Sequence, residues 1–356
     1  MTKHFLLIFA TLTVALTLTV CCGTEQQSNA FDLAKAHKAI ERLAKLLEED
    51  FIYPEVGKAY AKMLRENVAS NTYSKFKTHV DFTSAVTADL QAVHPEGHLK
   101  LQHQSINVSN NTMVTSETNG VGKAGWIAPG IAYISLHGFT GNTEEYNQLL
   151  IRLQAVLDDL STAKTLIIDA RPHVGGSLQE MDIMFSYFFD KPTALVLMDT
   201  RLDVEKRGGN PLTEGKTLKR IAGPEGIVRR VHQAVPSNKD TALSKAQIFL
   251  LISNKTASAG EHLSLALKRT KRATLIGETT AGAGHFGRTT SLGGGYQAFI
   301  PVGRTFDPDT EKGWEQTGIE PHIKTAAEQA FDEALKRAGV NQSAAKKALE
   351  SLKVNQ

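Results

Sequence analysis

Strand patterns that alternate with helical patterns constrain the fold of this 356-residue chain more than any other feature. Largely apolar runs such as Gly130–Leu136 and Thr165–Asp169 are typical of strands buried in a parallel sheet. Repeated βαβ units imply an α/β fold with a mostly parallel sheet, whose ligands bind beyond the carboxyl ends of the strands. We predict strands at 130–136, 165–169, 194–198, 248–252 and 273–277, and helices at 142–160, 178–189 and 259–268.

The segment before this core has the periodicity of a small helical bundle. Apolar residues recur every three or four positions from Phe31 to about Val93. Pro54 marks the start of a second helix, and Asp81 is a plausible N-cap for a third. The predicted domains are a helical domain at 31–104, an α/β core at 105–324 and a C-terminal helical tail at 325–356; residues 201–246 show no clear pattern.

The first thirty residues have the pattern of an export signal. A positively charged start precedes an apolar run that is short for a membrane span. The run ends at Cys21 and Cys22, in a junction similar to the lipobox of bacterial lipoproteins. We expect a signal peptide at 1–22 and a linker at 23–30. The protein would then be periplasmic in a bacterium, or anchored to a membrane through lipid on one of these cysteines.

Composition excludes several kinds of chemistry. The chain has two cysteines, both in the expected signal region, so the exported part has no disulfide and no thiolate nucleophile. A formal net charge of +3 without a basic stripe argues against nucleic-acid binding. The histidines at 94, 98 and 103 straddle Pro95 and Gly97 and share no helical face, so no metal site and no cofactor are expected.

Ser258 lies in the turn between the strand from Ile248 and the helix that follows. This position is at the carboxyl edge of the sheet, beside the unpaired amides and the positive dipole end of a helix. The amide of Ala259 could face an oxyanion, and Thr256 and Glu261 could brace the turn. Serine is also a preferred N-cap residue, and the turn taken alone favours that interpretation.

Two adjacent glycines, Gly175 and Gly176, follow the strand that ends at Asp169. Such glycines let the backbone approach a ligand closely, and their amides can form an anion-binding nest. An ordinary turn before a helix is the alternative interpretation. A phosphate loop is not indicated, because no G-K-[ST] follows.

Three motifs together resemble the carboxyl-terminal-processing (tail-specific) serine protease superfamily. They are D-A-R-P-H-V-G-G, T-A-S-A-G-E and G-E-T-T-A-G-A-G, in that order. The resemblance implies a crotonase- or ClpP-like βαβ core with Ser258 as the nucleophile. It also implies that the amides of Ala259 and of Gly175 or Gly176 form the oxyanion hole.

The chain departs from this pattern at Ala283, where typical members have the lysine that activates the serine. It is similar to the branch that contains tricorn core protease and the interphotoreceptor retinoid-binding protein repeats. The similar segments are the N-terminal helices, P-E-G-H-L-K-L and G-W-E-Q-T-G-I-E-P. This similarity implies His98 as the general base and Glu315 as the carboxylate that orients it. Other candidates are Glu278 or Glu320 for the carboxylate and His285 for the base.

The expected function is that of an exported serine peptidase that hydrolyses peptides or proteins through an acyl-enzyme. Residues 99–129 are too few for the PDZ domain of typical members, about 80 to 100 residues, so none is expected. One alternative is a non-catalytic protein that binds an apolar, retinoid- or lipid-like ligand. A less favoured alternative is an α/β-hydrolase esterase, which would have to use Asp307 or Asp309 with His322.

Overall fold

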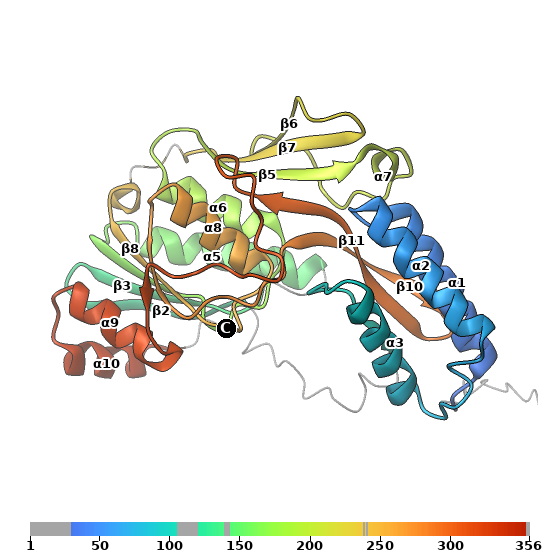
Figure 1. Ribbon diagram of the computed structural model, residues 1–356. Coiled ribbons are helices and arrows are strands. Elements are labelled where there is room, and N and C mark those ends of the chain that lie inside the picture. Colours follow the sequence, from blue (N-terminus) through green and yellow to red (C-terminus); the bar gives the residue numbers. More distant parts are fainter. Residues whose placement is uncertain (1–29, 105–119, 139–142, 238, 240, 354–356) are drawn as a thin grey trace, which may run out of the picture. The chain divides into compact units, whose positions relative to one another are not determined.

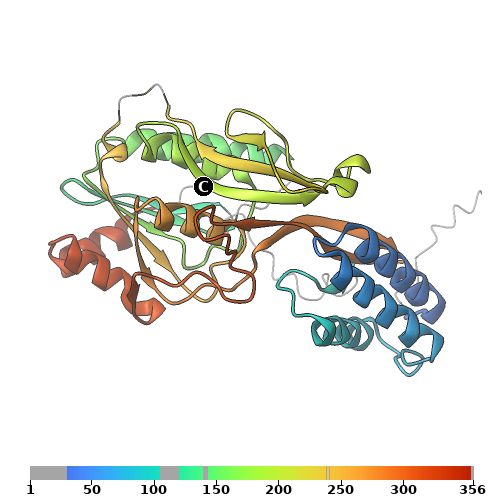
Figure 2. The same ribbon diagram turned by 45° about the horizontal axis from the view of Figure 1, so that its top comes forward.

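The parallel sheet expected from the βαβ pattern is one of two six-stranded sheets (Figures 1 and 2). The computed structural model describes residues 30–104, 120–138, 143–237, 239 and 241–353, so the expected signal peptide with Cys21 and Cys22 lies outside them. The strand order is β12-β9-β8-β4-β3-β2, and only the β2–β3 pair is antiparallel. The strands are β2 (Val121–Ala128), β3 (Ile131–Leu136), β4 (Thr165–Asp169), β8 (Gln247–Ile252), β9 (Thr274–Gly277) and β12 (Ile323–Lys324).

The two faces of this sheet are buried in different hydrophobic clusters, because successive side chains of a strand point to opposite faces. Ile168 and Leu250 share one cluster with the helices between the strands. Ile167 and Phe249 share another with the C-terminal helices. The helices of the first face are α5 (Thr143–Asp159), α6 (Leu178–Phe188) and α8 (Ala259–Arg269), and those of the second are α9 (Ala330–Arg337), after the short η3 (Ala327–Gln329), and α10 (Gln342–Ser351).

The second sheet is antiparallel, and the sequence patterns did not predict it. The segment 194–198 is a strand as expected, but it pairs antiparallel with β11 and β7 and does not join the parallel sheet. Three consecutive glycines, Gly293 to Gly295, all have positive φ and form the turn between β10 and β11. The strands are β1 (Leu101–His103), β5 (Thr193–Arg201), β6 (Leu218–Ile221), β7 (Ile227–Ala234), β10 (His285–Gly293) and β11 (Tyr296–Phe306).

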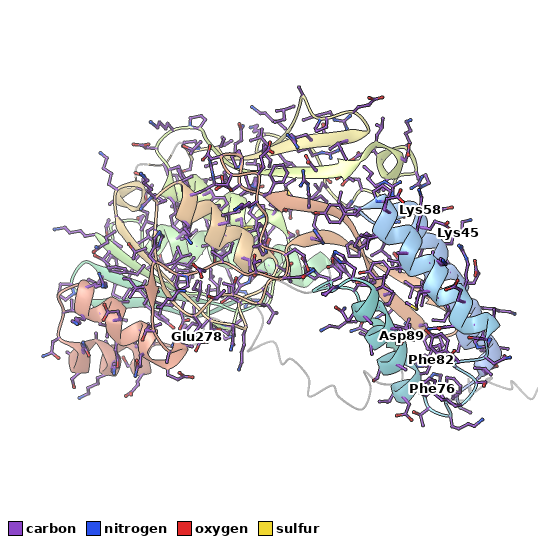
Figure 3. All side chains as sticks on the ribbon, in the orientation of Figure 1. Lys45, Lys58, Phe76, Phe82, Asp89 and Glu278 are labelled. Atoms are coloured by element: carbon purple, nitrogen blue, oxygen red, sulfur yellow. The ribbon has the colours of Figure 1, made fainter. Side chains whose placement is uncertain are left out.

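Three N-terminal helices pack against the β10–β11 hairpin, as Figure 1 shows. They are α1 (Leu33–Asp50), α2 (Pro54–Ala69) and α3 (His79–Val93). Thr78 caps α3 and Asp81 lies in its first turn, so the predicted N-cap at Asp81 was wrong by one turn. Phe82 is buried in the cluster shared with the hairpin, whereas Lys45 and Lys58 project outward into solvent (Figure 3).

Residues 201–246, which the sequence left unassigned, contain α7 (Leu202–Lys206), β6, β7 and the short η2 (Ala242–Ser244). Their charges pair with one another. Arg230 is buried, and its guanidinium contacts the carboxylates of Glu205 (2.8 Å) and Glu214 (2.9 Å). Among the helices of the described residues, none is both long and apolar enough to cross a membrane.

Candidate active site

Ser258 lies in a strained turn at the carboxyl edge of the parallel sheet. It immediately precedes α8, and its backbone adopts φ 55° and ψ −116°. A residue with a side chain rarely has positive φ, and such a conformation persists only where the surroundings hold it. The Ser258 carbonyl oxygen accepts hydrogen bonds from the amides of Glu261 (2.9 Å) and His262 (3.0 Å). Ser258 is thus the N-cap residue of α8, and Glu261 in the first turn accepts from its amide.

Glu261 holds the turn from the protein interior. Its side chain is fully buried. Burial raises the pKa of this carboxyl, and the hydrogen bonds that it accepts act in the opposite direction. The carboxylate ties the serine turn to the segment after β9. Its four donors are the amide of Ser258 (2.8 Å), the hydroxyl of Thr280 (2.6 Å) and the amides of Gly282 (2.6 Å) and Ala283 (2.9 Å).

Thr256 braces the other side of the turn. Its hydroxyl donates to the carbonyl oxygen of Ala170 (2.7 Å) and accepts from the amide of Ser253 (3.0 Å). The turn is thereby joined to the end of β4. The bracing roles expected of Thr256 and Glu261 are both observed.

The loop after β4 brings Gly175 against Ser258. Gly175 has φ 129°, and a Cβ on it would lie 2.9 Å from the Cβ of Ser258, so a side chain would not fit. The Gly175 amide donates to Nδ1 of His173 (3.2 Å). In the described part of the chain, the amides of Gly176 and Ala259 have no acceptor. These two amides remain available to stabilise an oxyanion.

A cavity of about 600 Å³ lies beside Ser258. It is bounded by α6, α8, the segment 211–218 and the start of β10. Gly176 and Ala259 line it together with the serine, and two histidines, His262 and His285, line it as well. A substrate bound here would therefore meet the hydroxyl of Ser258 and the amides of Gly176 and Ala259.

The loop that carries His98 packs onto Ala283. A Cβ on Gly97 would lie 3.0 Å from the Cα of Ala283, and the Gly97 amide donates to Glu315 (2.8 Å). The His98 ring stacks on Phe299 with the centroids 4.7 Å apart, and its buried Nδ1 has no hydrogen-bond partner among the described residues. Burial lowers the pKa of His98 to about 4, so the ring is neutral at neutral pH and can accept a proton.

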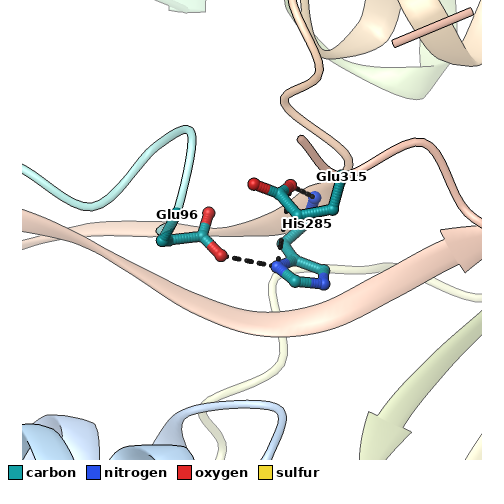
Figure 4. Close-up of side chains that lie close together, drawn as sticks. All are labelled: Glu96, His285 and Glu315. Atoms are coloured by element: carbon teal, nitrogen blue, oxygen red, sulfur yellow. Dashed lines mark hydrogen bonds and ion pairs between the residues drawn. The ribbon is translucent and has the colours of Figure 1, made fainter. Parts of the chain in front are cut away.

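Glu96 and His285, both buried, form a cluster with the partly buried Glu315 behind this loop (Figure 4). Nδ1 of His285 bonds to Glu96 (2.6 Å), and Glu96 also accepts from the amide of His98 (3.2 Å). Glu315 accepts from the amides of Gly284 (2.6 Å) and His285 (3.1 Å), in addition to the amide of Gly97. The cluster therefore clamps the 96–98 loop to the start of β10.

The same cluster has the composition of a metal site. One atom from each of Glu96, His285 and Glu315 lies within 4.8 Å of the others. These atoms already satisfy one another and the neighbouring amides, however. A metal ion would have to displace the bond between Glu96 and His285, so we assign the cluster to positioning the loop.

The comparison with protein families identifies this arrangement. A model described as peptidase family S41 matches residues 130–325, which is more than half of the chain. The chain belongs to peptidase family S41. A second model, the N-terminal domain of this S41 family in eukaryotic IRBP, matches residues 33–123. The two matches cover the helical segment and the α/β core of this S41 member in the expected order.

Solved structures share this S41 fold at low sequence identity. A lipoprotein from Streptococcus agalactiae has 15% identity and a TM-score of 0.58, over 86% of this chain and 97% of its own. A candidate peptidase from Parabacteroides merdae has 16% identity and a TM-score of 0.54, over 88% and 96%. The photosystem II D1 C-terminal processing protease has 15% identity and a TM-score of 0.53, over 87% and 98%. At these identities the likeness concerns the fold alone.

The structure brings Ser258, Ala259, Gly175 and Gly176 together, as the motifs predict. The His98 loop docks nearby, but in the described residues no hydrogen bond joins the His98 ring to Ser258 or to Glu315. Glu315 holds the backbone beside His98 and not its ring.

The other carboxylates considered for this role lie elsewhere. Glu278 accepts from the amides of Asn254 (3.5 Å) and Ala327 (3.4 Å), at the place labelled in Figure 3. Glu320 is exposed and bonds to Lys324 (3.1 Å). Glu96 was missed by the sequence analysis. The available signal was its place two residues before His98 in the same loop.

The residues that an esterase would need lie at the far end of α8. Asp307 and Asp309 bind Arg269, the last residue of this helix, at 3.0 and 2.7 Å. His322 accepts from the amide of Leu275 (3.0 Å). A helix of this length separates its two ends by roughly 16 Å. These residues therefore do not form a triad with Ser258.

Proposed function

We propose that this S41 member is a serine-type peptidase that hydrolyses peptide bonds through an acyl-enzyme. The observation that carries the proposal is the strained turn of Ser258, which lies beside a cavity and beside two amides that have no acceptor among the described residues. Ser258 Oγ attacks the peptide carbonyl carbon and becomes acylated while the amine leaves. The amides of Gly176 and Ala259 stabilise the oxyanion of each tetrahedral intermediate. Water then hydrolyses the acyl-enzyme and restores the serine.

We assign the base to His98, in agreement with the motif resemblance. Its loop rests on Ala283, the position from which the lysine of typical members would act, and its ring is neutral. His98 accepts the serine proton and returns it to the leaving amine. Glu315 supports this step by holding the Gly97 amide, and so acts on the loop.

A fluorophosphonate probe tests the proposal. We expect it to label the wild-type protein on Ser258, because the reagent reacts with activated serine hydroxyls, and to leave Ser258→Ala unlabelled. Mass spectrometry of the labelled peptide identifies the site, and circular dichroism confirms that the variant is folded. A folded wild-type protein that stays unlabelled would overturn the peptidase and support a protein that binds an apolar ligand in the cavity.

We further propose that the peptidase is exported and attached to a membrane through a lipid on Cys21 or Cys22. The apolar run and the cysteine junction support this proposal. The expected mature protein, isolated from bacterial cells, begins at one of these cysteines and carries added acyl mass. An intact N-terminus beginning at Met1, measured by mass spectrometry, would contradict it.

A further inference from the structure

Two buried histidines and a partly exposed aspartate form a hydrogen-bonded chain along the cavity beside Ser258. His262 of α8 bonds through Nε2 to Nδ1 of His232 on β7 (2.9 Å). Nε2 of His232 bonds to Asp182 of α6 (2.8 Å), whose other oxygen accepts from the hydroxyl of Thr217 (2.8 Å). The two histidines are 3% and 0% exposed. The reaction proposed above uses none of these groups.

The carboxylate fixes the direction of this chain. An ionised Asp182 can only accept, so Nε2 of His232 carries a hydrogen. In a neutral His232 ring, Nδ1 then accepts from Nε2–H of His262. Nδ1 of His262 is then a hydrogen-bond acceptor. Among the described residues it has no partner. Burial holds the pKa of His262 well below its ordinary value, which agrees with a neutral ring.

The cavity that His262 lines is mostly apolar. Its carboxylates are already engaged: Asp182 by His232 and Thr217, and Glu214 by arginines. An ammonium or guanidinium group would have to compete for these carboxylates with the groups that already bond to them. A large apolar body with one neutral donor at its end suits the site better. The apolar walls come from Leu178, Met181, Met198, Leu212, Phe286 and Trp314.

His262 lies close to the serine that would attack the substrate. It follows Ser258 by four residues, about one helical turn or roughly 6 Å along α8. Both residues line the same cavity. A side chain next to the attacked carbonyl would therefore enter the cavity with its end toward His262.

We propose that this cavity selects substrates with tyrosine on the acyl side of the scissile bond, through a hydrogen bond from the phenol hydroxyl to Nδ1 of His262. The inference rests on the proposed peptidase function. Phenylalanine would leave Nδ1 of His262 buried and unpaired, which costs about 1–3 kcal/mol. His232 is a positioning residue, because it fixes which nitrogen of His262 carries the hydrogen.

The test compares kcat/KM for peptides that differ only in tyrosine or phenylalanine at this position. We expect the wild type to prefer tyrosine by about 10- to 100-fold, and His262→Leu and His232→Leu to reduce the ratio to near one. His232→Gln should restore the preference, because a glutamine amide can donate to Asp182 and accept from His262. A wild-type ratio near one would overturn the proposal even if the leucine variants failed to fold.

A binding measurement tests the tyrosine pocket independently of the proposed peptidase activity. Calorimetry measures the affinity of Ser258→Ala for peptides that end in tyrosine amide or phenylalanine amide. A tyrosine preference without fluorophosphonate labelling of the wild type supports the pocket and overturns the peptidase. Labelling of Ser258 without any tyrosine preference, in turnover or in binding, overturns the pocket and leaves the peptidase standing.

Discussion

Replacing Glu261 by alanine is expected to remove both the reactivity of Ser258 and much of the stability of the core. Four donors converge on this buried carboxylate, and the amide of Ser258 is one of them. Without it, the donors are left unpaired in the interior, which costs about 1–3 kcal/mol for each group that no water reaches. We expect the free energy of unfolding to fall by about 3–5 kcal/mol, as for a broken buried charge network. Urea unfolding measures this change.

The loss of reactivity follows from the strain of the serine turn. A φ of 55° at Ser258 persists only while the surroundings determine it, and Glu261 is the partner of its amide. Fluorophosphonate labelling should fall to background in Glu261→Ala, even at temperatures where the variant is folded.

Two further substitutions control this experiment. Glu261→Gln keeps one accepting oxygen, so we expect an intermediate loss of stability. Glu320→Ala removes a glutamate with a side chain 64% exposed, so its stability should change by less than about 0.5 kcal/mol. Unchanged labelling in a folded Glu261→Ala protein would show that the turn holds its own conformation.

The parts of the fold that could be predicted are those with local signals. An apolar strand followed by a helix is visible within some twenty residues, and Ser258 and Gly175 both follow such strands. Their meeting requires only that parallel strands end at one edge. The pairing of distant strands in the antiparallel sheet has no comparable signal: β1, for example, pairs with β11 through contacts such as that of Leu101 with Ala298.

The cluster of Glu96, His285 and Glu315 behind the His98 loop was not predicted, because it too lacks a local sequence signal. Glu96 and His285 are 189 residues apart in the chain, and neither lies in a motif that indicates the other. Arg230 shows a second limit. Its segment is rich in charge and shows no clear sequence pattern, yet the arginine is buried because Glu205 and Glu214 neutralise it.

The second large expected effect is the loss of activity when the proposed general base, His98, is replaced. His98→Ala should lower kcat/KM by about 10² to 10⁴-fold, the usual contribution of a general base. The free-enzyme pH profile of the wild type should lose activity only as the pH falls toward the His98 pKa of about 4, because protonation then removes the base. This acidic limb should be absent from the residual activity of His98→Ala.

His285→Ala is the matched comparison, since His285 also lines the cavity and has Glu96 on its Nδ1. If it only positions the loop, its loss should lower the free energy of unfolding and reduce activity less than His98→Ala does. His285→Gln should then restore much of both, because its amide can still donate to Glu96. If instead His285→Ala is nearly inactive and His98→Ala is active, the general base is His285. Glu96 is then the carboxylate that orients the His285 ring. That result would leave Ser258 as the nucleophile, because either histidine can serve the same hydroxyl.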